Sequence, residues 1–444
     1  AMGIRLSDHF TYKKLLRFVL PSIAMMVFIS VYGVVDGFFV SNFAGKTSFA
    51  AINLVMPFVM LLGGIGFMVG TGGTALVSKV LGEGDREKAN RYFSMMVFLT
   101  LLLGVLLTAV GIAAMEPVAR FLGATDAMIA DSVLYGRIVV GFTTAFMLQN
   151  VFQSFLIAAE KPKLGLLATI AAGLTNILLD ALFFGGFGWG VAGAAIATGI
   201  SQCVGGLLPL FYFLRPNDSL LRLVRTKPEL APLVKACTNG SSELMSSISS
   251  SVVSMVYNFQ LLKYIGEDGV SAYGVLMYVS MIFHACFIGY AVGVSPVVSF
   301  HFGAQNRPEL HSLLRKSLRL IGGSSIAMLA AGEALARPLG QIFVGYDETL
   351  HALTEHAFRL FSFSFLLSGF NIFTSAFFTA LNNGFVSAAI SFLRTLLFQT
   401  CCVLVLPVLF DIDGIWWAIT AAEVFAFAIS LTFLLTKRKK YGYM

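Results

Sequence analysis

The stretch LGEGDR at residues 81–86 recurs as FGAQNR at residues 302–307. The two stretches keep an offset of 221 residues, from Gly82 to Gly303, and this offset is about half of the 444-residue chain. A repeat of half the chain length in a very apolar sequence indicates a membrane protein with two structural repeats, which is typical of transporters. Channels and membrane enzymes can also be duplicated, so the repeat by itself leaves the function open.

The composition places the chain in a membrane. Its mean hydropathy is +0.84, and 57% of its residues are hydrophobic whereas only 12% are charged. An ordinary soluble domain carries about 25% charged residues, so these values exclude that class. One bilayer crossing takes about 20 apolar residues, and the chain has enough for many crossings. The five cysteines lack the spacing of a metal site and are interpreted as small buried hydrophobic residues.

Apolar runs separated by charged residues or by Gly, Pro and Asn predict twelve helices. The expected fold class is therefore an all-α integral membrane protein with twelve transmembrane helices. Several runs exceed 30 residues, so those helices are expected to tilt, bend or extend beyond the bilayer. The predicted spans are 11–41, 47–81, 87–115, 126–158, 163–186 and 189–214 in the first half, and 230–262, 267–302, 308–336, 347–381, 385–410 and 413–436 in the second.

The distribution of Lys and Arg predicts the orientation of these spans. Twelve crossings put both termini on one side, and most of the 30 Lys and Arg residues lie on that side, in the termini, in the loops after even-numbered spans and in the mid-chain linker. Cytoplasmic loops carry such an excess, so both termini are predicted to be cytoplasmic in a multi-pass protein of the inner (cytoplasmic) membrane. The net charge of +7 is explained in this way, and no nucleic-acid partner is expected.

The stretch 215–235 is the natural boundary between the halves. It carries Pro216, Pro228 and Pro232 among charged residues and is the only long polar stretch in mid-chain. The prediction is one six-helix lobe over 1–218 and a second over 219–444. Each half has an even number of spans, so both enter from the same side, and the two pseudo-symmetric lobes form a parallel repeat about an axis along the membrane normal.

Acidic residues inside the first-half spans suggest a site that binds a proton or a small cation. A charged side chain within a span is costly, so each one deserves a functional hypothesis. Asp36 lies in the first span, and Asp180 in the fifth, where Asn176 precedes it by four residues and so shares its helix face. Buried carboxyl groups take up protons readily, and carboxylate and amide oxygens also suit a small hard cation. The alternative is that each aspartate only caps a helix end near the outer surface.

At these residues the chain resembles the multidrug and toxic compound extrusion (MATE) family of cation-coupled exporters, along nearly its whole length. The likeness is greatest to the bacterial branch with an aspartate on the first helix, and the loops at Gly82 and Gly303 resemble the family's repeat signature. The resemblance implies that the first helix bends at Pro21. It also implies a cation site in the first lobe made of Asp36, Tyr135, Asn150, Asn176, Asp180 and Thr198.

In the second lobe the resemblance is less complete. Glu243 matches an acidic residue that other branches of the family use for cations. The acidic partner expected on the tenth span is missing, and Asn371 and its neighbours offer only amide and hydroxyl groups. Glu243 and Asn371 are therefore a possible second polar site. Arg394 and Glu423 both lie at mid-membrane depth, so an ion pair between them is predicted, with a structural role because it neutralises two costly charges.

The fourth span carries amides on or near one helix face, at Gln149, Asn150 and Gln153. The resemblance suggests that this face borders the substrate cavity of the first lobe. The chain also has 42 Phe and 17 Met residues, which can form adaptable apolar walls for a broad organic substrate.

The sequence thus favours an antiporter that exports hydrophobic or cationic organic compounds in exchange for H⁺ or Na⁺. The expected partners are the small-molecule substrate, the coupling ion and membrane lipid, with a monomeric chain, no further cofactor and no metal other than a possible Na⁺. One alternative is a lipid or glycolipid flippase of the same superfamily, which would favour several cavity cations for phosphate groups. A channel is a further alternative, while an intramembrane enzyme would need a nucleophile or metal set that the sequence does not show.

Overall fold

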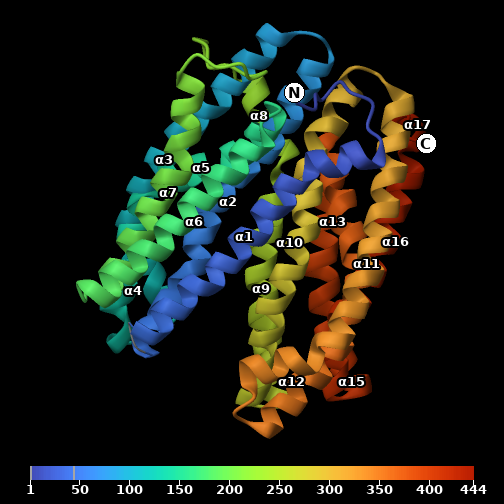
Figure 1. Ribbon diagram of the computed structural model, residues 1–444. Coiled ribbons are helices and arrows are strands. Elements are labelled where there is room, and N and C mark those ends of the chain that lie inside the picture. Colours follow the sequence, from blue (N-terminus) through green and yellow to red (C-terminus); the bar gives the residue numbers. More distant parts are fainter. Residues whose placement is uncertain (1–2, 44–45) are drawn as a thin grey trace.

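The computed structural model describes residues 3–43 and 46–444, and within these residues all regular structure is helical. Figure 1 shows two bundles side by side, with the blue and green first half in one and the yellow to red second half in the other. The first half contains α1 (Tyr12–Phe43), α2 (Lys46–Gly82), α3 (Arg86–Phe121), α4 (Asp126–Gly141), α5 (Thr143–Ala158), α6 (Pro162–Asp180), the π-helical segment η1 (Ala181–Gly186) and α7 (Val191–Leu214).

The second half begins after a stretch without helix, 215–229. Its elements are α8 (Leu230–Asn239), α9 (Ser241–Tyr264), α10 (Glu267–Gly303), α11 (Arg307–Val344), α12 (Glu348–Phe361), the short η2 (Ser362–Ser364), α13 (Phe365–Ala380), α14 (Gly384–Ser391), the π-helical segment η3 (Phe392–Gln399), α15 (Thr400–Phe410), α16 (Ile412–Thr436) and α17 (Arg438–Tyr441). The division at 218/219 stays a prediction.

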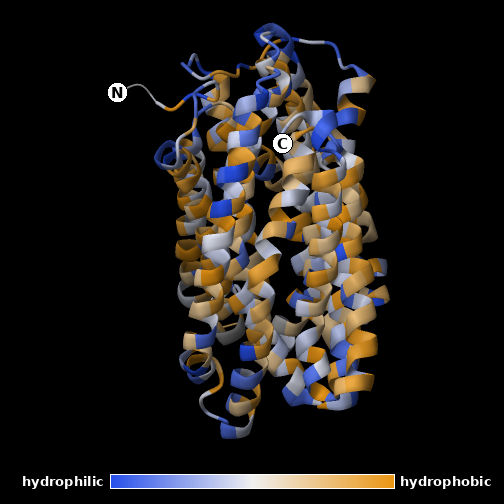
Figure 2. Ribbon diagram, turned by 90° about the vertical axis from the view of Figure 1, so that its right-hand side faces the viewer, coloured by the Kyte–Doolittle hydropathy of each residue, from blue (hydrophilic) through white to orange (hydrophobic). Residues whose placement is uncertain are grey.

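The twelve predicted spans correspond to these helices. Of the residues that the structure describes, ten helical segments are long and apolar enough to cross a bilayer, and the bent pair α4–α5 gives an eleventh. The serine-rich α9 is not among them and takes the place of the remaining span. Figure 2 shows hydrophobic residues along the length of the molecule and hydrophilic ones gathered toward its ends. This distribution is that of a multi-pass membrane protein.

Two of the predicted spans are not single straight helices. The span expected at 126–158 is one of the runs longer than 30 residues, and as expected for such a run it is bent, by 54° between α4 and α5. The helix expected at 230–262 is divided into α8 and α9 at Gly240, which lies against α2: a Cβ atom there would come within 1.9 Å of the Met68 carbonyl oxygen. The close helix contact therefore requires glycine at this point.

The two repeats cross each other at α2 and α10 in a reciprocal way. A Cβ on Gly82 would lie 1.9 Å from the carbonyl oxygen of Phe300, and a Cβ on Gly303 would lie 1.9 Å from that of Lys79. Both glycines and both carbonyl groups keep the 221-residue offset, so the recurring stretches form one symmetric contact between the lobes. Only glycine permits backbones to approach so closely.

The N-terminal segment and the C-terminus lie at the same end of the bundle in Figure 1, as an even number of crossings requires. α1 runs through Pro21 as one continuous helix. The bend implied at Pro21 stays a prediction.

Candidate functional site

Asp36 of α1 and Asp180 of α6 meet inside the first lobe (α1–α7). Their carboxyl groups are close enough to share a hydrogen bond, and the Asp180 side chain is fully buried. Asp180 does not cap a helix end, because the helix continues beyond it as η1. Two carboxylates at this separation repel each other, and a shared proton or a bound cation removes the repulsion.

Asn176 lies between the two carboxyl groups. With its amide turned so that the nitrogen faces the acids, Nδ2 donates to Asp36 Oδ1 at 3.0 Å and to Asp180 Oδ2 at 2.9 Å. The orientation is set by chemistry, since the opposite one would point the amide oxygen at two acceptors. The predicted convergence of the two α6 side chains on one point is therefore present, and Asp36 completes the cluster.

Two further predicted residues lie beside this cluster. Tyr135 of α4 is buried near the Thr198 hydroxyl and within electrostatic reach of both carboxyl groups. Within the described part of the chain, neither Asp180 Oδ1 nor Thr198 Oγ1 has a hydrogen-bond partner although both are buried. Buried oxygens of this kind are seldom left unpaired in native proteins, and they can bind a proton-bearing group or a hard cation.

The backbone at Asp180 is unusual. The α-helix changes to the π-helical η1 directly after this residue. π-helical segments within α-helices occur frequently at functional sites. Asp180 itself keeps helical backbone angles (φ −59°, ψ −48°), and no feature of the sequence predicted the π-helical segment that follows it.

Tyr32 and Ser201 also belong to the site, although the sequence analysis did not select them. Tyr32 precedes Asp36 by one helical turn and lies within its electrostatic reach. The Ser201 hydroxyl lies 3.4 Å from the Asn176 amide and donates to the Thr198 carbonyl oxygen at 2.7 Å. The four-residue spacing from Tyr32 to Asp36 and the three-residue spacing from Thr198 to Ser201 are the signals that could have identified both.

The other first-lobe candidates have different surroundings. Asn150 is buried, and its Nδ2 donates to the Gly63 carbonyl oxygen of α2 at 3.0 Å, so its amide nitrogen ties α5 to α2. Gln149 is buried against Gly205 of α7. The buried Gln153 Oε1 has no partner in residues 3–43 and 46–444. Their predicted part in cation or substrate binding stays a prediction.

In the second lobe (α9–α16), Arg394 of η3 and Glu423 of α16 form an ion pair with an N–O distance of 2.9 Å. Glu423 Oε2 also accepts a hydrogen bond from Asn371 Nδ2 at 2.6 Å, and Ser430 donates to Asn371 Oδ1 at 3.1 Å. The structure therefore brings together the two residues predicted to pair. Asn371 lies with this ion pair. Glu243, which was predicted to share a polar site with Asn371, is not among the hydrogen-bond partners of Asn371.

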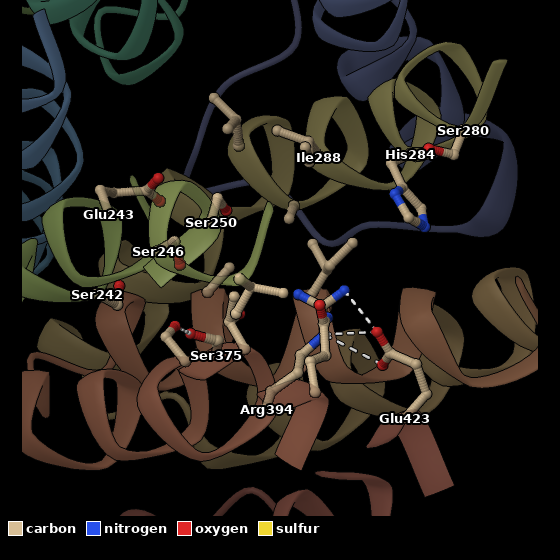
Figure 3. Close-up of a pocket in the computed structure, with 18 of the residues that line it drawn as sticks. Ser242, Glu243, Ser246, Ser250, Ser280, His284, Ile288, Ser375, Arg394 and Glu423 are labelled. Atoms are coloured by element: carbon tan, nitrogen blue, oxygen red, sulfur yellow. Dashed lines mark hydrogen bonds and ion pairs between the residues drawn. The ribbon is translucent and has the colours of Figure 1, made fainter. Parts of the chain in front are cut away.

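Glu243 lies near the beginning of α9 and lines a cavity of about 350 Å³. Figure 3 shows Glu243 and neighbouring serines of α9 to one side, His284 of α10 opposite, and the Arg394–Glu423 pair of η3 and α16 below them. Thr71 of α2 and Ser154 of α5 also line this cavity, so it extends to the first lobe. It can accept a small organic molecule.

Comparisons with known proteins agree on one family. The MatE family model matches residues 21–182 and 244–403. The multidrug export protein MepA of Staphylococcus saprophyticus subsp. saprophyticus is 24% identical over 96% of this chain and 94% of its own length. A crystal structure of MATE in complex with MaL6 superposes with a TM-score of 0.94 at 22% identity, covering all of both chains. An outward-facing multidrug resistance MATE family transporter has a TM-score of 0.93 at 22% identity, covering all of this chain and 99% of that one. At these identities the solved structures establish the shared fold.

Proposed function

Because this chain belongs to the MatE family, we propose that it exports organic compounds across the cell membrane by antiport with a cation. The relatives named as multidrug export proteins support the export of drug-like compounds. The observation that carries the coupling is the buried cluster of Asp36, Asn176 and Asp180, in which Asp180 Oδ1 has no hydrogen-bond partner among the described residues. The coupling ion is H⁺ or Na⁺, and no other cofactor is proposed.

The chemistry of coupling follows from the two carboxyl groups. When both are ionised, their repulsion favours separation of α1 from α6, and binding of one cation removes it. α1 therefore has different stable positions in the cation-bound and cation-free states, with Pro21 as the proposed bending point. A change from mostly one state to mostly the other needs about 5.5 kcal/mol of differential binding, which one neutralised buried charge can supply.

Tyr135 and Thr198 are proposed to orient or bind the cation, and Asn150 to border the site. The substrate is proposed to be a hydrophobic or cationic small molecule, handled by a monomeric protein with both termini in the cytoplasm. The flippase alternative is less well supported, because Arg394 is the one Lys or Arg among the described residues that line the cavity, and it is already paired with Glu423.

The test is efflux of an organic cation from proteoliposomes under separately imposed pH and sodium gradients. Wild type should respond to at least one gradient, and Asp36→Asn should lose that response. Asp268→Asn is the matched control, since Asp268 is exposed at the beginning of α10. Undiminished gradient-driven efflux in Asp36→Asn would show that this site does not couple transport to the cation.

A further inference from the structure

A basic pocket lies where the N-terminal segment 3–11 meets the beginning of α1, at the end of the bundle that holds both termini (Figure 1). Its volume is about 560 Å³. The charged residues that line it are Asp8, Arg5, Lys13, Lys14 and Arg17. Four basic side chains and one acidic side chain give the pocket a net charge of +3. Nothing in the proposed coupling mechanism uses these groups.

Both lobes hold the pocket wall that the N-terminal segment forms. The Leu6 backbone N–H donates to Glu160 Oε1 of the first lobe at 2.9 Å. The Phe10 backbone N–H donates to Glu309 Oε1 of α11 at 2.9 Å. The side chains of Leu6 and Phe10 are fully buried. The segment is therefore packed against the protein, and its charged side chains have a defined position next to α1.

Asp8 neutralises one of the four cations. Its Oδ2 lies 2.9 Å from Lys14 Nζ and accepts from the Arg5 backbone N–H at 3.0 Å, so it joins the segment to the first turn of α1. No described residue forms an ion pair or a hydrogen bond with the side chain of Lys13 or Arg17. These two cations are four residues apart on one helix face, where like charges repel each other. An anion between them would remove the repulsion.

The same face of α1 continues from these cations to exposed apolar side chains. Leu16 and Leu20 follow Lys13 by three and seven residues and are 43% and 61% exposed. At 1.5 Å per residue, Leu20 lies about 10 Å farther along the helix than Lys13. Because α1 is long and apolar enough to cross a bilayer, the cations lie at the depth of lipid headgroups and the leucines at the depth of acyl chains.

A phospholipid matches both parts of this surface. Its phosphodiester oxygens can accept from an ammonium and a guanidinium together, and its acyl chains continue from the phosphate into the bilayer. A soluble anion would meet the cations but leave the leucines uncovered. A headgroup with an amine would add a positive charge to a pocket whose net charge is already +3. The charge therefore favours a headgroup without an amine.

We propose that this pocket binds the headgroup of an anionic phospholipid. The phosphate lies between Lys13 and Arg17, and an acyl chain follows Leu16 and Leu20 along α1. The lipid belongs to the leaflet at the end of the molecule where both termini lie. The site is separate from the candidate cation site and from the second-lobe cavity, and it does not depend on the proposed export of organic compounds.

Two lipids with the same acyl chains test this. Phosphatidylglycerol has a phosphodiester and no amine, whereas phosphatidylcholine has the same phosphodiester and a quaternary ammonium. Native mass spectrometry of the full-length protein, titrated with each lipid in detergent, measures the apparent dissociation constants. Wild type should bind phosphatidylglycerol more tightly than phosphatidylcholine. In Lys13→Gln/Arg17→Gln, the tightest binding of phosphatidylglycerol should weaken about tenfold, and binding of phosphatidylcholine should change little.

Arg222→Gln/Arg225→Gln is the matched control. Both residues are exposed arginines of the stretch 215–229, at the same end of the molecule and outside the pocket (Figure 1). This variant loses the same charge, yet it should bind phosphatidylglycerol as wild type does. Lys13→Arg/Arg17→Lys keeps both charges and should also keep the preference. Equal weakening in the two glutamine variants would mean diffuse attraction to a basic surface and would overturn the site, as would unchanged binding in Lys13→Gln/Arg17→Gln.

A soluble phosphate ester shares the chemistry of the headgroup, so glycerol phosphate is added as a competitor. Because it has no acyl chain to cover Leu16 and Leu20, it should displace phosphatidylglycerol only at far higher concentrations than the lipid itself. Competition at similar concentrations would assign the pocket to a soluble anion and overturn the lipid proposal. None of these measurements involves a gradient or an exported compound, so their result is independent of the efflux assays.

Discussion

Arg394 Nε lies 2.9 and 3.1 Å from the two carboxylate oxygens of Glu423, so the ion pair joins η3 to α16 inside the second lobe. Asn371 extends the network to α13 through its hydrogen bond to Glu423. Three helices are therefore held by one set of buried polar groups, and loss of either charge leaves the other without compensation.

This network predicts an asymmetry in stability. Arg394→Met alone should destabilise the protein by about 3–5 kcal/mol, because it leaves the buried Glu423 carboxylate unpaired. Arg394→Met/Glu423→Leu should restore most of that loss, since apolar side chains can fill the space without a charge. Thermal unfolding in detergent measures both. A double variant as unstable as the single one would show that the pair contributes more than mutual neutralisation.

The reciprocal contact of α2 and α10 predicts strict requirements at two glycines. Gly303→Ala should impair folding or transport, because its Cβ would lie 1.9 Å from the Lys79 carbonyl oxygen and backbone atoms cannot move aside cheaply. The expected cost is about 1–3 kcal/mol. Gly82→Ala should have the same effect at the symmetric position, against the Phe300 carbonyl oxygen.

Gly323→Ala in α11 is the control for these variants. A Cβ at Gly323 meets no atom within 4 Å, and alanine is the better helix former, so this change should be neutral or slightly stabilising. Yield and thermal unfolding of the three variants give the comparison. Tolerance of alanine at Gly82 and Gly303 would contradict the close crossing of the repeats.

Asn176 and Asn150 should respond differently to the same substitution. Asn176→Leu removes the donor that lies between Asp36 and Asp180, so the apparent affinity for the coupling cation should change by about tenfold. Asn150→Leu removes the hydrogen bond to Gly63 and should mainly cost stability, by about 1–3 kcal/mol. Efflux as a function of cation concentration, together with thermal unfolding, separates the effects. Equal changes in cation affinity would instead place Asn150 in the site.

The surroundings of Glu160, which lies outside the membrane spans, predict that the stability of the protein depends on pH. It lies between α5 and α6, where Glu160 Oε1 accepts from the Leu6 backbone N–H at 2.9 Å, and burial raises the pKa of its carboxyl above the usual 4.5. The folded state therefore binds this proton more tightly than the unfolded state. The contribution of Glu160 to stability is present at low pH and is lost as the pH rises through its folded-state pKa.

Glu160→Gln keeps an acceptor for Leu6 but cannot titrate. Its unfolding temperature should fall less than that of wild type between about pH 4.5 and neutrality. The measurement is thermal unfolding of both proteins over this range. Identical slopes would mean that other groups dominate the pH dependence.

Much of the fold could be predicted because the bilayer imposes simple rules. The twelve spans could be predicted from hydropathy, since each crossing needs a long apolar helix. The repeat then divides them into two equivalent sets of six. The pairing of Arg394 with Glu423 could be predicted from depth alone, because the constant rise of a helix converts residue number into position across the membrane. The same argument could not show that Asn371 joins the pair, since depth says nothing about which helices are neighbours.

The candidate cation site shows the same limit. Asn176 and Asp180 are four residues apart and share a helix face, so their convergence could be predicted from the local sequence. The approach of Asp36, and the bonding of Asn150 to Gly63, depend on how α1, α2 and α5 pack. The π-helical segments next to Asp180 and around Arg394 could not be predicted either, because tertiary packing rather than a residue motif determines where they form.

The sequence by itself determined that this is a duplicated, twelve-span membrane protein with deep carboxyl groups in its first half. It could do so because hydropathy, loop charge and helical spacing act locally along the chain. Only the tertiary structure decided which of the deep polar groups meet. It brought Asp36, Asn176 and Asp180 together in one lobe, and in the other it left Glu243 and Arg394 on separate walls of one cavity. That outcome depends on packing between helices far apart in sequence, and no local rule contains it.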